Sequence, residues 1–399
     1  MKRFALAVAV CGLFALGTPL WAQEAGNADS DAPSGETATV APTTPPSLQE
    51  QVDELRAKLQ ELEAQLQKGA EAQESTSRDI YAINDAAAKL VTGPKLKFSG
   101  YVQAQVTDDR AASPKTDFQV RRARLKLEAP ITDLASATLE FDATRSVSLK
   151  EAFIDLGRAT DVWRVRAGQS KVPFMYDILQ SSSARLAPEQ TAVAQYVFPS
   201  EYDQGAWLQL KNALGDAIPG TTLDVGIQDG QGPNTADLNE GKDLVARLRF
   251  VLGNTPPDKS MEANSVYLGY LDGKFTKGTA TTDKTAFGGG ISYLLGPVWL
   301  RAEYLAGQKL GLDFTGWYGQ AAYQFTNAVD TFFVRYDTLD ENTDAPNTSV
   351  SDWTVGLEHF LDSSTRLILA HEFRSPESGY SQYAKTNGDL TTLRLQVKY

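Results

Sequence analysis

Residues 393–399 read Leu-Arg-Leu-Gln-Val-Lys-Tyr (LRLQVKY), in which apolar and polar residues alternate up to an aromatic last residue. Side chains of an extended strand point alternately to its two sides. One face of such a strand would carry Leu393, Leu395, Val397 and Tyr399, and the other Arg394, Gln396 and Lys398. The fold then depends on how often this pattern recurs and on which solvent each face meets.

The same period of two recurs from about residue 95 onward, and turn-forming residues separate the repeats. It predicts sixteen strands, at residues 95–107, 116–129, 135–146, 148–157, 161–170, 203–212, 219–229, 242–252, 262–274, 283–295, 297–307, 314–326, 328–338, 350–361, 363–374 and 389–399. A β-rich stretch of roughly 300 residues is long for one soluble sandwich, but it is an ordinary length for a closed barrel.

The connections between these strands alternate in length. Short ones at 157–161, 295–297, 326–328 and 361–363 alternate with mostly long ones that include 107–116, 274–283 and 170–203, and a tight link at 146–148 is the exception. Tight turns at one end and long loops at the other are typical of outer-membrane barrels whose termini both lie at the tight-turn end. The predicted fold class is all-β: a 16-stranded antiparallel transmembrane β-barrel over residues 94–399, with a short N-terminal periplasmic coiled-coil helix.

The two faces of the predicted strands differ in charge. One face is apolar and rich in aromatic residues, as at Trp163, Phe287, Trp317 and Trp353, and it suits a lipid environment. The opposite face carries the basic residues that we expect to line a pore: Arg122, Arg124, Lys126, Arg164, Arg166, Arg247, Arg249, Arg301, Arg335 and Arg394. A dry core could not hold so many unpaired charges, so we predict a water-filled interior. A soluble sandwich with its charged face in bulk water is the alternative.

Carboxylates interrupt this basic face. The candidate acidic residues of the pore are Glu128, Glu140, Asp142, Glu151 and Asp155. Arginine rows favour anions in a narrow pore, and carboxylates on the facing wall would add a transverse field. Each of these side chains could instead serve only in an ion pair of the wall.

The N-terminal part of the chain has a different character. Residues 1–22 combine a basic start, an apolar run and Ala22 before Gln23, which predicts a cleaved signal peptide; a membrane anchor is the alternative. Residues 23–46 are predicted to be a disordered linker because they are rich in Ala, Pro, Thr, Ser and acids. Residues 47–93 are predicted to form a helical, coiled-coil periplasmic segment, or else one helix docked on its own domain. The coiled-coil seam is Leu48, Val52, Leu55, Leu59, Leu62 and Leu66.

Four stretches carry a resemblance to a known family. They are FQVRRARLKLEA at 118–129, LKEAFIDL at 149–156, RAGQSKVPF at 166–174 and QGAWLQL at 204–210. With the long connection that follows residue 170, they resemble the phosphate-selective porin O/P family of the bacterial outer membrane. The match is most specific between about residues 96 and 212.

The resemblance implies a homotrimer of sixteen-stranded barrels that passes small anionic solutes such as phosphate by passive diffusion. It also implies that a loop folds inward to narrow the pore. The connection at 171–202 is the candidate by length, and the constriction would then contain Lys171, Arg185, Glu189 and Glu201. The expected partners are outer-membrane lipid, the solutes and, through the terminal aromatic residue, the outer-membrane assembly machinery. A general or non-anion-selective porin and a structural anchor that uses the coiled coil are the alternatives.

Other chemistry finds little support in the sequence. The chain has one cysteine, Cys11 in the predicted signal peptide, and two histidines, His359 and His371. We therefore expect no metal site, no cofactor and no enzyme activity. A barrel hydrolase is conceivable, but no spacing indicates a catalytic trio. The formal net charge of -12 argues against nucleic acid as a partner.

Overall fold

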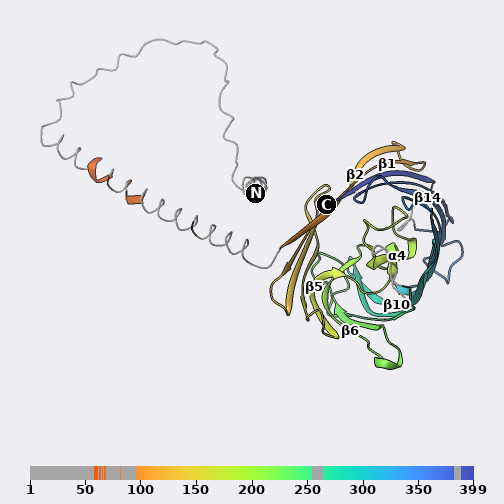
Figure 1. Ribbon diagram of the computed structural model, residues 1–399, viewed down its shortest axis with the longest axis horizontal. Helices are drawn as coiled ribbons and strands as arrows, with labels where there is room; N and C mark the ends of the chain where they lie inside the picture. Colours follow the sequence, from red (N-terminus) through yellow and green to blue (C-terminus); the bar gives the residue numbers. More distant parts are fainter. Residues whose placement is uncertain are drawn as a thin grey trace, which may run out of the picture. The chain divides into compact units, whose positions relative to one another are not determined.

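The computed structural model describes residues 96–253, 264–381 and 388–399, together with residues 58–61, 63, 65, 67, 68 and 81. Within these residues sixteen antiparallel strands form a closed barrel, shown in Figure 1, in which strands adjacent in sequence pair and the first pairs with the last. The strands are β1 (Lys97–Asp109), β2 (Thr116–Pro130), β3 (Ala135–Asp142), β4 (Ser148–Leu156), β5 (Trp163–Lys171), β6 (Tyr202–Lys211), β7 (Thr221–Gln228), β8 (Asp243–Val251), β9 (Ser265–Lys277), β10 (Ala280–Leu295), β11 (Val298–Lys309), β12 (Leu312–Gln324), β13 (Asp330–Asp340), β14 (Ser349–Phe360), β15 (Thr365–Pro376) and β16 (Leu390–Lys398). The predicted sixteen-stranded closed barrel is confirmed.

Most of the N-terminal predictions concern residues outside the described ones. The predicted signal peptide at 1–22 and linker at 23–46 lie there entirely. Within 47–93, the nine described positions are helical, and Leu59 is the one residue of the predicted seam among them. No helix in the described part of the chain is long and apolar enough to cross a membrane.

The pairing of β16 with β1 closes the barrel. The register sets Val102 opposite Val397 and Gln105 opposite Arg394. At the end of the strand, Gly100 and Tyr399 exchange two backbone hydrogen bonds of 3.0 Å. A Cβ atom on Gly100 would lie 2.5 Å from the Tyr399 hydroxyl oxygen, so a glycine is needed where this ring crosses β1. We call this end of the barrel, where β1 begins and β16 finishes, the terminal end, and the opposite one the loop end.

The two faces of each strand separate as the alternation predicts. On β16, Leu393 and Leu395 are exposed on the outside by 48% and 41%, whereas Arg394 between them is exposed by 1%. Aromatic side chains that were expected to meet lipid are also exposed on the outer face, among them Trp163, Phe287, Trp317, Phe332 and Trp353. The apolar face is therefore the outer face of the barrel.

Two loop-end connections are tight turns, and one of them, at 274–283, was predicted to be long. Strands β9 and β10 are joined by residues 278–279, and β11 and β12 by residues 310–311. Gly278 and Gly311 have φ angles of 65° and 78°, the left-handed backbone that two-residue hairpin turns require. At the β9–β10 connection the prediction was wrong because both strands extend beyond their apolar part. Polar residues such as Thr281 and Asp283 belong to this extension, where no alternation of apolar and polar residues is visible.

Other connections are longer than predicted. The link expected to be tight at 146–148 spans residues 143–147 at the loop end. At the terminal end, residues 212–220 include a 3-10 turn, η1 (Gly215–Ala217), and β8 ends at Val251 whereas β9 begins only at Ser265. The two ends are therefore less sharply sorted by loop length than the sequence suggests.

Candidate pore and inserted loop

Residues 172–201, between β5 and β6, fold into the barrel, and we call them the inserted loop. They contain the short helices α3 (Tyr176–Leu179) and α4 (Ala192–Val197), and Figure 1 shows α4 within the ring of strands. Loop residues such as Met175 and Ile178 have no exposed surface. They pack with inward-facing wall residues of β8 to β14: Val245, Leu271, Ala286, Leu305, Phe314, Tyr318, Leu339 and Val350. An apolar core therefore fills the space beside these strands.

Two carboxylates of the barrel wall hold the helices of the inserted loop. Glu303 on β11 accepts hydrogen bonds from the backbone N–H groups of Tyr176 at 2.7 Å and Asp177 at 3.0 Å. It also accepts bonds from the hydroxyl groups of Tyr267, at 2.6 Å, and Tyr318. Asp337 on β13 accepts a bond of 3.0 Å from the backbone N–H of Ala192, at the start of α4. The start of a helix has free N–H groups and attracts negative charge, so both contacts favour the inserted position.

Charged residues inside the loop tie its two arms together. Asp177 accepts bonds of 2.9 and 3.0 Å from the backbone N–H and hydroxyl of Thr191, and Arg185 lies 3.3 Å from the same carboxylate. Burial alone would raise the pKa of Asp177, but Arg185 and Arg335 outweigh it and lower the pKa below its ordinary value. Asp177 is therefore ionised and links α3 to the start of α4.

The expected constriction residues Lys171 and Glu201 meet where the loop joins the barrel. Their side chains form an ion pair of 2.7 Å, and Arg185 lies 3.5 Å from the Glu201 carboxylate. Glu201 has a φ angle of 67°, which is uncommon for a residue with a side chain. These charges fix the two ends of the loop to each other.

Glu189 connects the loop to strands β2 and β16 of the barrel wall. Its carboxylate accepts bonds of 2.9 and 2.7 Å from Arg121, 3.2 Å from Arg122 and 2.8 Å from Arg394. Burial would raise its pKa, but Arg122, Arg121 and Arg394 together hold the pKa of Glu189 well below its usual value. The fourth residue expected at a constriction thus neutralises part of a three-arginine cluster.

Arg121 is a residue that the sequence analysis missed, because strict alternation turns it away from the lumen. The β1–β2 register shifts between Gln103 and Ala104, which pair with Arg122 and Val120 and leave Arg121 without a partner. A bulge of this kind changes the direction of a side chain, so two consecutive arginines reach Glu189. The Arg-Arg pair at 121–122 in an otherwise alternating strand is the only sequence signal.

Most of the expected pore residues on β2 to β5 form ion pairs with one another. Arg124 contacts Glu140 at 2.5 Å and Asp142 at 3.0 Å. Lys126 contacts Glu151 at 3.0 Å and Glu128 at 3.9 Å. Asp155 accepts two bonds of 2.8 and 2.9 Å from Arg166 and lies 3.7 Å from Arg164. The five acidic candidates are therefore the local partners of the basic ones.

The remaining basic candidates divide into two groups. Arg301, Arg335 and Arg394 contact the inserted loop: Arg301 donates to Gln180 at 2.8 Å, Arg335 to the carbonyl of Glu189 at 2.9 Å and Arg394 to that of Pro188 at 2.8 Å. Arg247 and Arg249 on β8 instead line a cavity at the side of the loop. The structure thus separates residues that support the loop from residues that border open space.

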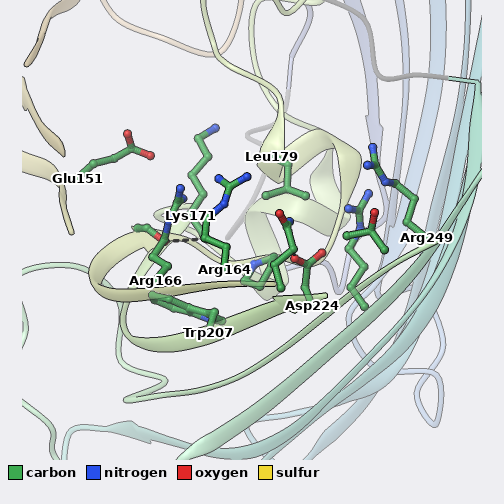
Figure 2. A pocket seen from close by; sticks show the side chains of 13 residues that line it. Glu151, Arg164, Arg166, Lys171, Leu179, Trp207, Asp224 and Arg249 are labelled. Atoms are coloured by element: carbon green, nitrogen blue, oxygen red, sulfur yellow. Dashed lines mark hydrogen bonds between the residues drawn. The ribbon is translucent and has the colours of Figure 1, made fainter. Parts of the chain in front are cut away.

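This cavity, shown in Figure 2, measures about 290 Å³. Its lining consists of Glu151, Arg164, Arg166, Ser170, Lys171, Pro173, Leu179, Trp207, Gln209, Thr222, Asp224, Arg247 and Arg249. A second cavity of about 330 Å³ shares Glu151, Lys171 and Leu179 with it and extends to Tyr101, Lys398 and Tyr399. The two adjoin along these shared residues. Polar space thus lies beside β1 to β8, opposite the wall on which the loop packs.

Among the described residues, no group of three or more His, Cys, Asp or Glu side chains could hold a metal ion. His359 contacts Asp330 at 2.7 Å, and His371 contacts Thr391 at 2.8 Å. Each histidine therefore has a separate partner within the barrel wall.

A closed sixteen-stranded barrel with an apolar outer face, a charged interior and an inward-folded loop defines a porin-type channel of the bacterial outer membrane. The chain belongs to the family of phosphate-selective porins O and P, whose model matches residues 95–399. This confirms the resemblance seen in the sequence, and family and fold together indicate a channel rather than an enzyme.

Solved structures with a similar fold include several porins. The anion-selective porin from Comamonas acidovorans is 16% identical with a TM-score of 0.59, and the match covers 77% of this chain and 99% of that one. OmpF of Salmonella typhi, solved with daunomycin, is 14% identical with a TM-score of 0.60 and coverages of 77% and 98%. OmpT of Vibrio cholerae in its trimer form is 10% identical with a TM-score of 0.58 and coverages of 77% and 100%. A comparison with curated protein sequences gave no match.

Proposed function

We propose that this porin lets small anionic solutes, phosphate among them, diffuse passively across the outer membrane. The observation that carries the proposal is the charge of the cavity beside the inserted loop. Five of its lining residues are cationic (Arg164, Arg166, Lys171, Arg247 and Arg249) and two are acidic (Glu151 and Asp224). A positive excess in a narrow passage lowers the electrostatic barrier for anions.

The ion pairs of the wall limit this effect. Asp155 and Glu201 lie outside the cavity lining but neutralise Arg166 and Lys171. The proposed channel therefore favours anions over cations without excluding cations completely. The proposed path follows the two cavities beside β1 to β8, with the loop end facing the outside of the cell and the terminal end facing the periplasm.

Ion selectivity tests this proposal directly. The purified protein is placed in planar lipid bilayers with a tenfold gradient of potassium chloride. It should give stepwise currents and a reversal potential displaced from zero toward the equilibrium potential of chloride. A double variant, Arg247→Gln with Arg249→Gln, should move the reversal potential toward zero, because it removes two cavity charges. A reversal potential at zero or on the potassium side for the unmodified protein would favour a general or cation-selective porin.

We further propose that the protein is a homotrimer that residues 1–22 direct to export, with residues 47–93 as a periplasmic coiled coil. The family resemblance and the leucine spacing support this assembly. Chemical cross-linking of the protein in detergent should give three-chain products. Deletion of residues 47–67 should leave the conductance per barrel unchanged. A deletion variant without conductance would indicate that the segment takes part in the channel. Cross-linking that stops at single chains would contradict the trimer.

A further inference from the structure

The cavity beside the inserted loop combines a cationic wall with an apolar one. Resting on the function proposed above, we propose that this cavity binds small organic anions, in which a carboxylate is attached to an apolar body, in preference to inorganic oxyanions. Arg247 would bind the carboxylate, and the side chains of Trp207, Leu179 and Pro173 would contact the body. Figure 2 shows Leu179 of the loop between the β5 arginines and Arg249 of β8, with Trp207 nearby on β6.

Arg247 is the cation that gives the cavity its anion-binding character. Arg164 and Arg166 share Asp155, and Lys171 pairs with Glu201. The Arg247 side chain, 3% exposed, forms no hydrogen bond or ion pair with any described residue, and its Nε and Nη2 atoms are buried without partners. Asp224 lies opposite Arg247 in the β7–β8 register, but its carboxylate accepts a hydrogen bond of 2.8 Å from Gln209 and forms no ion pair with Arg247. A buried guanidinium without an ion-pair partner is costly, and a bound anion would supply one.

Two aromatic rings hold Arg247 in place. Its guanidinium carbon lies 4.7 Å from the ring centre of Tyr267 and 5.2 Å from that of Tyr176. Both rings are themselves fixed, since the Tyr267 hydroxyl donates to Glu303 at 2.6 Å and the Tyr176 hydroxyl bonds with Ser265 at 2.7 Å. Cation–π contacts stabilise the charge without neutralising it. The positive group is therefore positioned before a solute arrives, which lowers the entropic cost of binding.

The apolar part of the lining comes from the loop and from β6. Trp207 is 5% exposed, and its indole Nε1 is buried without a hydrogen-bond partner. Its ring lies over Gly226 of β7, where an added Cβ atom would be 2.2 Å from the indole Cδ1. Gly226 thus makes room for the indole at the cavity wall. An inorganic oxyanion would leave the indole, Leu179 and Pro173 without an apolar partner, whereas an organic anion would cover them.

The size of the cavity agrees with such a solute. Its volume of about 290 Å³ greatly exceeds the ~10–15 Å³ that one water molecule needs. There is room for a ring-sized body next to the carboxylate.

Block of the chloride current by benzoate tests the inference, with benzamide as the neutral analogue and inorganic phosphate as the oxyanion. Benzoate should block the unmodified channel at lower concentration than phosphate, and benzamide should not block. Arg247→Gln should raise the half-blocking concentration of benzoate about 10–100-fold, the range expected for a lost hydrogen bond to a charged group. Arg247→Lys, which keeps the charge, should give an intermediate value and guards against misfolding of the glutamine variant. Leu179→Ser should weaken block by benzoate about threefold or more and leave block by phosphate unchanged.

Arg158→Gln is the matched control, because Arg158 is an exposed arginine in the turn between β4 and β5. Its benzoate block should equal that of the unmodified protein. Equal block by benzoate and phosphate, or block that survives Arg247→Gln, would overturn this inference while the chloride current persists. Absence of any chloride current would instead contradict the proposed channel function, so the two failures are distinguishable.

Discussion

Replacing Glu303 by glutamine is expected to release the inserted loop from the barrel wall and to raise the single-channel conductance. The carboxylate accepts four hydrogen bonds, two from backbone N–H groups of α3 and two from tyrosine hydroxyl groups. A glutamine side chain keeps one acceptor oxygen and turns an NH₂ group toward other donors. Hydrogen bonds to charged groups contribute about 1.5–3 kcal/mol each. The loss of two such bonds would therefore change the equilibrium constant between the inserted and the released loop by roughly a hundredfold or more.

The conductance and current noise of Glu303→Gln in planar bilayers measure this effect. A loop that leaves the apolar wall should give larger and more variable open levels than the unmodified channel. Glu377→Gln is the control, because Glu377 is a carboxylate of the loop end that also accepts a backbone hydrogen bond, from Ser349 at 2.9 Å. Open levels identical to those of the unmodified protein would show that Glu303 does not hold the loop.

Replacing Glu189 by glutamine is expected to make the channel more selective for anions. The carboxylate is the partner of Arg121, Arg122 and Arg394, and its removal leaves three guanidinium groups with one less negative charge among them. A unit charge at 4 Å contributes about 1 kcal/mol even in water, so the chloride-to-potassium permeability ratio should rise by about fivefold. Reversal potentials in a potassium chloride gradient measure the ratio. Asp344→Asn, which removes an exposed acid of the loop end, is the control and should change it little.

The same residue predicts how selectivity depends on pH. Because the surrounding arginines hold the pKa of Glu189 well below its usual value, the carboxylate remains ionised between pH 7 and pH 5. A group with a lowered pKa keeps its stabilising effect above its ordinary pKa and loses it only as the pH falls through the lowered one. The contribution of Glu189 to selectivity should thus be constant across this range. A change between pH 7 and pH 5 in the unmodified protein that is absent from Glu189→Gln would contradict the assignment.

Alternation along the chain was enough to predict the barrel, because each strand repeats the same physical constraint. Leu393 and Leu395 meet the outside and Arg394 the inside for the same reason as the residues of every other strand. The exceptions follow local backbone changes. The bulge that turns Arg121 inward has no periodic signal, and the polar hairpin around Gly278 continues as strand beyond the residues whose alternation is visible.

The site was less predictable, because it depends on contacts between distant parts of the chain. The length of the connection after residue 170 identified the loop but not the wall on which it packs. That choice depends on Glu303 and Asp337, which lie 127 and 145 positions from the loop backbone groups they bind. Likewise, Arg166 and Arg247 each face an aspartate on the neighbouring strand, Asp155 and Asp224. Only the structure shows that Asp155 forms an ion pair with its arginine whereas Asp224 accepts from Gln209 instead.

The packing of the inserted loop on one side of the barrel divides the circumference into two arcs with different tolerance for change. Strands β11 and β13 provide Glu303 and Asp337, which bind the backbone of the loop, so substitutions there alter folding and transport together. Strands β5 to β7 border the cavity through side chains that the apolar core does not use, such as Arg164, Gln209 and Asp224. Selectivity can therefore diverge along this second arc while the architecture stays the same, and these are the positions at which the barrel could be redesigned as a sensor for a chosen analyte.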